Sequence, residues 1–171
     1  MISKLKTLIA AVLLVGPITL GAPAHAQARG VGVVSIDAAP DDDVPSGYRV
    51  FVRGGRTPTP LDAVEWAARA AGIGAGEILL TAIHRDGARI GFDLPLTRRV
   101  ADAVGVPVVA SGGAGAPGHF VDALADGRAD AALGAGIFHD GLVSVAEVKH
   151  ALSMAGLPVS DPPTPATRED A

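Results

Sequence analysis

The sequence predicts an α/β fold in which helices cover a mainly parallel β-sheet. Four short apolar runs, each nearly continuous in Val, Ile, Leu and Ala, alternate with segments of helical periodicity. Polar or glycine residues follow each run, at Asp37, 81–87, 111–115 and 134–136. Because ligands bind at the carboxyl ends of parallel strands, these four segments predict one functional rim.

The first unit combines a strand, a loop, a short extra strand and a helix. A β-branched strand is expected over 31–37, a surface loop rich in Asp and Pro over 38–47, and a hairpin arm over 48–52. Thr59 and Pro60 predict the start of a helix, as N-cap and first helical residue. Its apolar face would consist of Leu61, Val64, Ala68 and Ala71.

The other three units repeat the order of strand and then helix. Strands are expected over 77–81, 106–110 and 129–133. Helices are expected from the cap Asp93 through Val104, over 118–126, and after a capping box at Ser144–Glu147.

A glycine-rich turn over 110–115, Ala-Ser-Gly-Gly-Ala-Gly, joins the third buried strand to its helix. Adjacent glycines at such a junction let backbone N–H groups approach an anion closely, because no Cβ blocks the way. A tight turn that binds no ligand explains the same residues, so the local sequence leaves both interpretations open.

Composition excludes several classes of site. The 171 residues carry a net charge of −4 without a basic cluster beyond Arg98-Arg99, so no nucleic-acid partner is expected. The chain contains no cysteine, which excludes disulfides and thiolate chemistry. The histidines are scattered, and no metal site or other cofactor is predicted.

The two ends of the chain differ from the domain expected over 30–157. Residues 1–26 have a basic start, an apolar run and an Ala-His-Ala ending, which together predict a secretory signal peptide. The run is short for a stable membrane span, and a start-site artefact or a fusion is the alternative explanation. The proline-rich tail over 158–171 is expected to be disordered.

Several segments resemble one enzyme family, the cyclase subunit of imidazole glycerol phosphate synthase. The resemblance runs from about residue 30 to 159 and rests on segments 35–38, 54–67, 77–87, 110–115 and 129–139. It covers the C-terminal half of that family's (βα)8 barrel. The resemblance therefore implies a TIM-barrel-like half barrel of four parallel βα units, preceded by the signal-peptide-like segment.

The resemblance implies a lyase of histidine biosynthesis. The family forms imidazole glycerol phosphate and an aminoimidazole carboxamide ribonucleotide from a phosphoribulosyl-formimino ribonucleotide and ammonia. Asp37 matches the family's general acid, whereas the second family aspartate belongs to the N-terminal half. Turnover by this chain is therefore expected to be incomplete or impaired. The related isomerase of the same pathway shares the phosphate loops but matches less well.

The resemblance also implies a set of binding residues. Thr81 would face the substrate, Asp86 would contact it or serve only in a turn, and backbone or hydroxyl groups would bind phosphate at Gly87, Ser111, Gly112, Gly113, Ala135 and Gly136. The chain departs from the family at His84, Ala88 and Gly136, where aspartate, threonine and serine are usual. The missing serine hydroxyl at Gly136 predicts weaker phosphate binding, and His84 near the phosphate would partly offset this loss. Without the resemblance, His84 is expected to be a solvent-exposed loop residue.

Partners and location follow from the same considerations. The family implies a glutaminase subunit as the ammonia source and a cytoplasmic location, whereas the first 26 residues predict export. Four parallel strands leave open edges, which predicts a homodimer. The alternative function is a non-catalytic, exported half barrel that binds phosphate esters.

Overall fold

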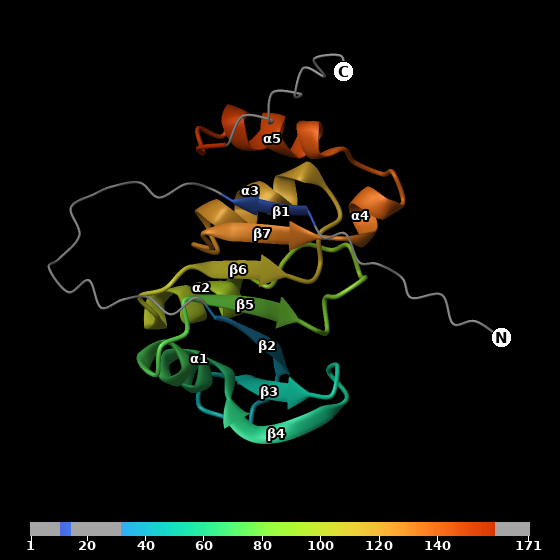
Figure 1. Cartoon of the computed structure of the whole chain (residues 1–171). Coiled ribbons are helices and arrows are strands. Elements are labelled where there is room, and N and C mark those ends of the chain that lie inside the picture. The colour runs from blue at the N-terminus through green and yellow to red at the C-terminus, as the bar shows by residue number, and fades with distance from the viewer. Residues whose placement is uncertain (1–10, 15–31, 160–171) are drawn as a thin grey trace, which may run out of the picture.

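The computed structural model describes residues 11–14 and 32–159, which form one seven-stranded sheet with helices (Figure 1). The strands are β1 (Ala11–Leu14), β2 (Val33–Pro40), β3 (Tyr48–Val52), β4 (Thr57–Asp62), β5 (Glu77–Ala82), β6 (Val108–Ser111) and β7 (Ala131–Gly134). The helices are α1 (Ala63–Gly72), α2 (Leu94–Ala103), α3 (Pro117–Ala125), α4 (Gly136–His139) and α5 (Val145–Met154).

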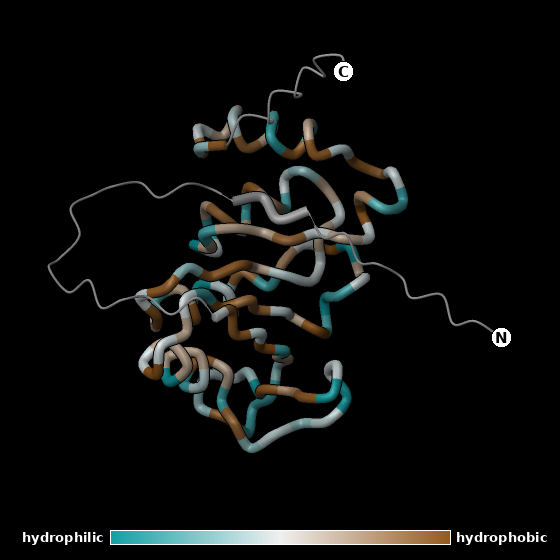
Figure 2. The backbone as a smooth tube through the Cα atoms, in the orientation of Figure 1, coloured by the Kyte–Doolittle hydropathy of each residue, from teal (hydrophilic) through white to brown (hydrophobic). Residues whose placement is uncertain are grey.

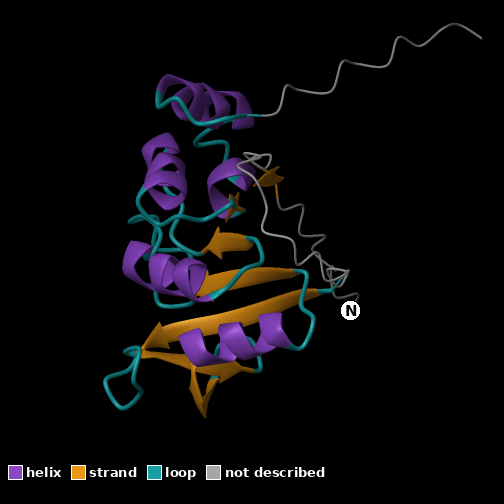
Figure 3. Cartoon of the chain, turned by 90° about the vertical axis from the view of Figure 1, so that its left-hand side faces the viewer, coloured by secondary structure: helices purple, strands orange, loops and turns teal. Residues whose placement is uncertain are grey.

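The centre of the sheet is parallel, and its strands are adjacent in chain order. β2, β5, β6 and β7 lie side by side in that order, and each pair is parallel. Right-handed crossovers between strands added in sequence place the connecting helices on one face. Figure 3 shows the helices that cover β5, β6 and β7 to one side of the strands. The predicted α/β fold is confirmed, with the arrangement of consecutive units in a (βα)8 barrel.

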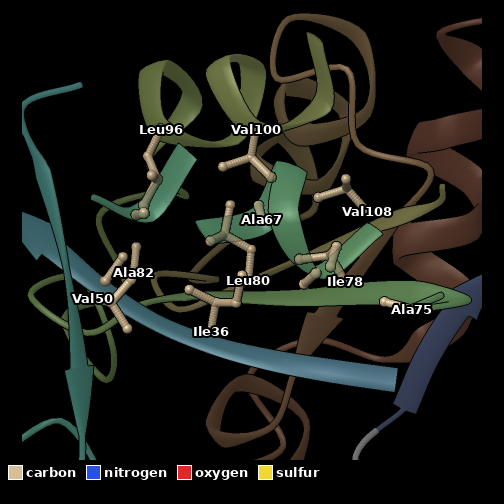
Figure 4. Close-up of a cluster of buried hydrophobic side chains, with 13 residues drawn as sticks. Ile36, Val50, Ala67, Ala75, Ile78, Leu80, Ala82, Leu96, Val100 and Val108 are labelled. Carbon is tan, nitrogen blue, oxygen red and sulfur yellow. The ribbon is translucent and has the colours of Figure 1, made fainter. Parts of the chain in front are cut away.

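Alternate side chains of the parallel strands separate the two faces of the sheet. Ile36, Ile78 and Leu80 are buried against α1 and α2 in the cluster drawn in Figure 4. Since successive side chains of a strand point to opposite faces, their neighbours Asp37 and Thr81 belong to the other face, which no helix of the described residues covers. The strand burial thus determines which polar residues can line a site.

A second cluster fills the space between β6, β7 and the last helices. Phe120 of α3 is fully buried and meets the Phe92 ring edge-on, with ring centroids 5.5 Å apart. Val148 and Leu152 of α5 complete the cluster. In Figure 2 the parallel strands are largely hydrophobic, whereas the loop that joins β3 to β4 is hydrophilic.

Strand β2, the first of the four predicted strands, extends further than predicted. β2 continues to Pro40 because Asp37–Pro40 pair with the antiparallel strand β3, so the expected loop begins only at Asp41. Proline is acceptable at this position because it ends the strand and needs no ladder N–H beyond it. The predicted hairpin arm over 48–52 is confirmed as β3.

The predicted helix start at Thr59-Pro60 is wrong. These residues belong to the edge strand β4, where the missing proline N–H costs no ladder bond, and the Thr59 hydroxyl donates to the Val50 carbonyl at 2.8 Å. Helix α1 begins at Ala63, and the Asp62 carboxylate accepts the backbone N–H groups of Val64 and Glu65.

The shifted start of α1 also changes its buried face. The face expected from Leu61, Val64, Ala68 and Ala71 is wrong, since Leu61 lies in β4 and Ala68 is exposed. The buried residues of the helix are Ala63, Ala67 and Ala70, whose small side chains let the helix pack closely on β2 and β5.

Two predicted helix caps are confirmed. Asp93 caps α2 by accepting the Leu96 N–H at 3.0 Å, and Ser144 and Glu147 form the capping box of α5. The short helix α4 begins at Gly136, the last of the small residues expected after the fourth strand over 134–136. No helix among the residues that the structure describes is long and apolar enough to cross a membrane.

Most of the signal-peptide-like segment lies outside the described residues, as does the tail from 160 onward. Within that segment, Ala11–Leu14 form β1, which pairs antiparallel with β7. The opposite side of the parallel strands is partly paired as well, because β3 covers the C-terminal half of β2. The open edges predicted for the parallel sheet are therefore reduced to part of β2 within the described chain.

Candidate functional site

Three polar side chains lie in register at the carboxyl ends of neighbouring parallel strands. Asp37 of β2 is opposite Thr81 of β5, and Thr81 is opposite Ser111 of β6. Each follows a residue that is buried under the helices, namely Ile36, Leu80 or Ala110, so all three belong to the uncovered face. Neighbouring strands lie about 4.8 Å apart, which puts Asp37 about 10 Å from Ser111.

The environment of Asp37 favours its protonated form. Partial burial raises the pKa of the Asp37 carboxyl, and the nearby Asp86 carboxylate raises this pKa further. Asp86 lies in the loop that joins β5 to α2, so two neighbouring units jointly set the protonation of this group. A carboxyl with a raised pKa is suited to donate a proton to a substrate near neutral pH.

A small pocket lies at the same rim, between the ends of β5, β6 and β7. Its volume is about 110 Å³, and six of the residues implied by the resemblance line it: Asp86, Gly87, Ser111, Gly112, Ala135 and Gly136. Gly113, Thr81 and Asp37 are outside this lining. The structure therefore brings the phosphate-loop residues together and leaves Asp37 beside Thr81, on the uncovered face.

Two backbone donors of the pocket wall are free to meet a ligand. No hydrogen bond between described residues uses the backbone N–H groups of Gly87 and Gly136, both of which are exposed. Ser111 adds a half-buried hydroxyl at the end of β6. Oriented N–H groups and a hydroxyl can hold an anion without a bound metal ion.

The glycine-rich turn packs directly on the loop that joins β5 to α2. The Gly91 N–H donates to the Gly113 carbonyl at 2.8 Å, and a Cβ on Gly113 would lie only 2.1 Å from the Gly91 oxygen. A Cβ on Gly115 would meet the Arg89 oxygen at 2.1 Å. Glycine is required at both positions because the two backbones are in contact.

Comparison with known proteins identifies the family. The model of the histidine biosynthesis protein family matches residues 23–144. The chain belongs to this family.

Two curated relatives agree with that assignment. The chain is 56% identical over 127 residues to the imidazole glycerol phosphate synthase subunit HisF of Metallosphaera sedula, covering 74% of this chain and 49% of that protein. It is 56% identical over 125 residues to the subunit of the same name from Myxococcus xanthus, covering 73% of this chain and 48% of that protein. The chain thus spans about half the length of the curated relatives it matches.

In this member of the histidine biosynthesis family, His84 is not part of the pocket wall. Its Nε2 lies 3.1 Å from Oδ2 of Asp93, the buried cap of α2. The other Asp93 oxygen accepts the Tyr48 hydroxyl at 3.1 Å. Burial raises the pKa of Tyr48, as do the charge and hydrogen bond of Asp93. The sequence suggested a solvent-exposed loop residue or a partner for phosphate, and it gave no sign of this contact between units.

Arg89 is a residue of the pocket wall that sequence reasoning missed. It follows the Asp86-Gly87 turn, and its φ of 58° is in the left-handed region, where residues other than glycine are uncommon. The arginine side chain forms an ion pair with Asp140, just after α4. Only the spatial approach of these two loops reveals the contact, since 51 positions separate the residues.

We predict that Gly113→Ala destabilises the protein by at least about 2 kcal/mol, because the new Cβ meets the Gly91 carbonyl and φ is +107°. Gly118→Ala in α3 is the matched control. No atom lies within 4 Å of the added methyl group there, so it is expected to stabilise the helix by up to about 1 kcal/mol. Urea unfolding of both variants measures the difference, and equal stabilities would contradict the close packing of the turn.

We predict that Asp86→Asn lowers the pKa of the Asp37 carboxyl, because the substitution removes the carboxylate that disfavours ionisation of Asp37. The pH titration of the Asp37 carboxyl carbon by NMR measures this shift. Asp42→Asn, in the exposed loop after β2, serves as the control and should leave the midpoint unchanged. If the titration midpoint of Asp37 does not move in Asp86→Asn, the Asp86 carboxylate does not influence the pKa of Asp37, which would contradict the prediction.

Proposed function

We propose that the chain provides the general acid and one phosphate site of a cyclase of histidine biosynthesis. The reaction class is that of a lyase, which forms imidazole glycerol phosphate and an aminoimidazole carboxamide ribonucleotide from a phosphoribulosyl-formimino ribonucleotide and ammonia. The 56% identity to two proteins named imidazole glycerol phosphate synthase subunits supports this proposal. The ammonia would come from a glutaminase partner, as the resemblance implies.

The position and pKa of Asp37 carry the proposal most directly. The carboxyl lies near the end of the parallel pairing of β2 with β5, on the face that no described helix covers, where a substrate has access. Its pKa is raised by partial burial and by Asp86, so it keeps its proton to higher pH than an exposed aspartate. Thr81, opposite Asp37 in the next strand, would orient the substrate through its hydroxyl.

The pocket at the rim is the proposed site of a substrate phosphate. Free N–H groups of Gly87 and Gly136 and the Ser111 hydroxyl would donate to the phosphate oxygens. Gly112 and Ala135 would shape the wall or add backbone donors, and Gly113, which lies outside the wall, would hold the glycine-rich turn against Gly91. Hydrogen bonds to a charged group are worth about 1.5–3 kcal/mol each, so a few such donors suffice for recognition.

The proposed architecture is a half barrel that pairs with a second copy of the chain. Residues 33–36 of β2 form an edge that β3 does not cover, and the Val33 side chain there is 58% exposed. An unpaired strand edge with an exposed apolar side chain favours association with another strand. A symmetric dimer would join two such edges and bring the uncovered faces together.

We predict that the protein consumes the ribonucleotide substrate when ammonium replaces the glutaminase, and that Asp37→Asn lowers the rate by about 10²–10⁴-fold, the usual contribution of a general acid. The decrease in substrate absorbance measures turnover. Since Asp37 must be protonated to act, the rate should fall as pH rises through its pKa, and Asp86→Asn should move this decline to lower pH. Asp42→Asn is the control for the loss of an exposed carboxylate.

Two results of the turnover assay would contradict this proposal. A folded wild-type chain that binds inorganic phosphate but shows no turnover would favour the second candidate, a non-catalytic protein that binds phosphate esters. Turnover that persists in Asp37→Asn would remove Asp37 from the chemistry.

We predict that light scattering gives twice the mass of the 17.1 kDa chain and that Val33→Lys gives the monomer mass. A lysine on the uncovered edge would place two like charges together in the symmetric dimer. Circular dichroism should show that the variant keeps its secondary structure. A wild-type protein that remains a monomer at micromolar concentration would contradict the dimer.

A further inference from the structure

The pocket contains two charged side chains of opposite sign, and the positive one is not available in the present arrangement. Asp86 and Arg89 are the charged residues of the wall, whereas the other lining residues are small or apolar apart from Ser111. Arg89 forms an ion pair with Asp140, which lies outside the wall. With Arg89 neutralised in this way, Asp86 leaves the pocket with a negative charge that opposes an entering anion.

The backbone of Arg89 is fixed so that its side chain reaches the mouth of the pocket. Its carbonyl packs on Gly115, where a Cβ would lie 2.1 Å from the oxygen, and its φ of 58° is in the left-handed region. Such a backbone conformation persists only where surrounding contacts determine it. Nη2 of the guanidinium lies 4.0 Å from the point at which a Cβ on Gly136 would stand. The absence of a side chain at Gly136 thus leaves space beside the guanidinium and the free N–H.

The bond between Arg89 and Asp140 is easily exchanged for another anion. Their side chains are 43% and 54% exposed, and ion pairs of this kind contribute about 0–1 kcal/mol. A phosphate ester accepts two parallel hydrogen bonds from a guanidinium and carries more charge than a carboxylate. The pair also connects the loop after β5, which lines one side of the pocket, with the end of α4, whose first residues Gly136 and Ile137 line another side.

We propose that Arg89 is a binding residue of the anion pocket that exchanges Asp140 for the phosphate of a phosphomonoester. In the free protein Asp140 holds the guanidinium at the pocket mouth. When the ester enters, the guanidinium turns to its phosphate, and Asp140 is released to solvent. This inference rests on the proposed phosphate site and adds to it the group that supplies positive charge and the carboxylate that competes for that group.

Two opposite effects on affinity test the exchange. The probe is inorganic phosphate, added to the full-length protein while the amide signals of Gly87 and Gly136 are followed by NMR. Arg89→Gln should weaken phosphate binding about tenfold or more, because the charged donor is lost. Asp140→Asn should strengthen binding by a few fold, because the competing carboxylate is removed from the guanidinium.

The chain offers a matched control pair away from the pocket. Arg128 has the same φ of 58° and forms an exposed ion pair with Asp102. Arg128→Gln and Asp102→Asn therefore change net charge and ion pairing equally, and both should leave phosphate affinity unchanged. If Arg89→Gln and Arg128→Gln weaken phosphate binding equally, the loss reflects net charge rather than a contact of Arg89 with phosphate, and the inference is overturned.

The remaining outcomes separate this inference from the proposed phosphate site. A wild-type protein whose Gly87 and Gly136 signals do not respond to phosphate has no anion pocket, and both proposals fail. Wild-type binding that is unchanged in Arg89→Gln overturns the role of Arg89 and leaves the backbone site in place. Weaker binding in Asp140→Asn would show that Asp140 supports the bound state rather than competing with it, which also overturns the exchange.

Discussion

The contact between the glycine-rich turn and the loop after β5 determines the shape of the rim. The Gly91 N–H donates to the Gly113 carbonyl at 2.8 Å, and the Arg89 carbonyl faces Gly115 without room for a Cβ. Side chains cannot adjust such a contact, because it consists of backbone atoms on both sides. The contact therefore fixes the position of one loop relative to the other, and with it the positions of Asp86 and Arg89.

The proposed acid and its neighbours on the sheet are positioned independently of the loops, by strand register and side-chain alternation. Register aligns Asp37, Thr81 and Ser111 across three strands, and alternation turns them away from the helices. Burial of Ile36 and Leu80 enforces this choice, since a shift by one residue would move those apolar side chains to the uncovered face. The proposed acid thus depends on the core, whereas the pocket depends on loop packing.

The parts of the fold that depend on periodicity could be predicted from the sequence. Four buried strands, the Asp93 cap and the capping box of α5 are local patterns with few alternatives. The helix start predicted at Thr59-Pro60 was wrong because the same two residues suit both a helix start and an edge strand. A better signal lay three residues later, where Asp62 and Glu65 have the spacing of a capping box.

The candidate site was predictable only where it follows the strands. Asp37, Thr81 and Ser111 end apolar runs, so their common rim follows from the topology. The contact of His84 with Asp93, and that of Arg89 with Asp140, join residues of different loops or elements. Side-chain pairs of this kind depend on loop conformation in space, for which a single sequence has no periodic signal.

The structure gives a different explanation for the glycines of the turn than the sequence did. Gly112, Gly113 and Gly115 are required by packing, because an added Cβ would lie 2.6 Å or less from a backbone oxygen at each. Their presence is therefore not by itself evidence for an anion. Gly136 differs, since its nearest neighbour to an added Cβ is the Arg89 guanidinium at 4.0 Å. The case for a phosphate site consequently rests on the unused N–H groups of Gly87 and Gly136 and on the nearby arginine, and the glycine-rich turn contributes by holding that arginine in place.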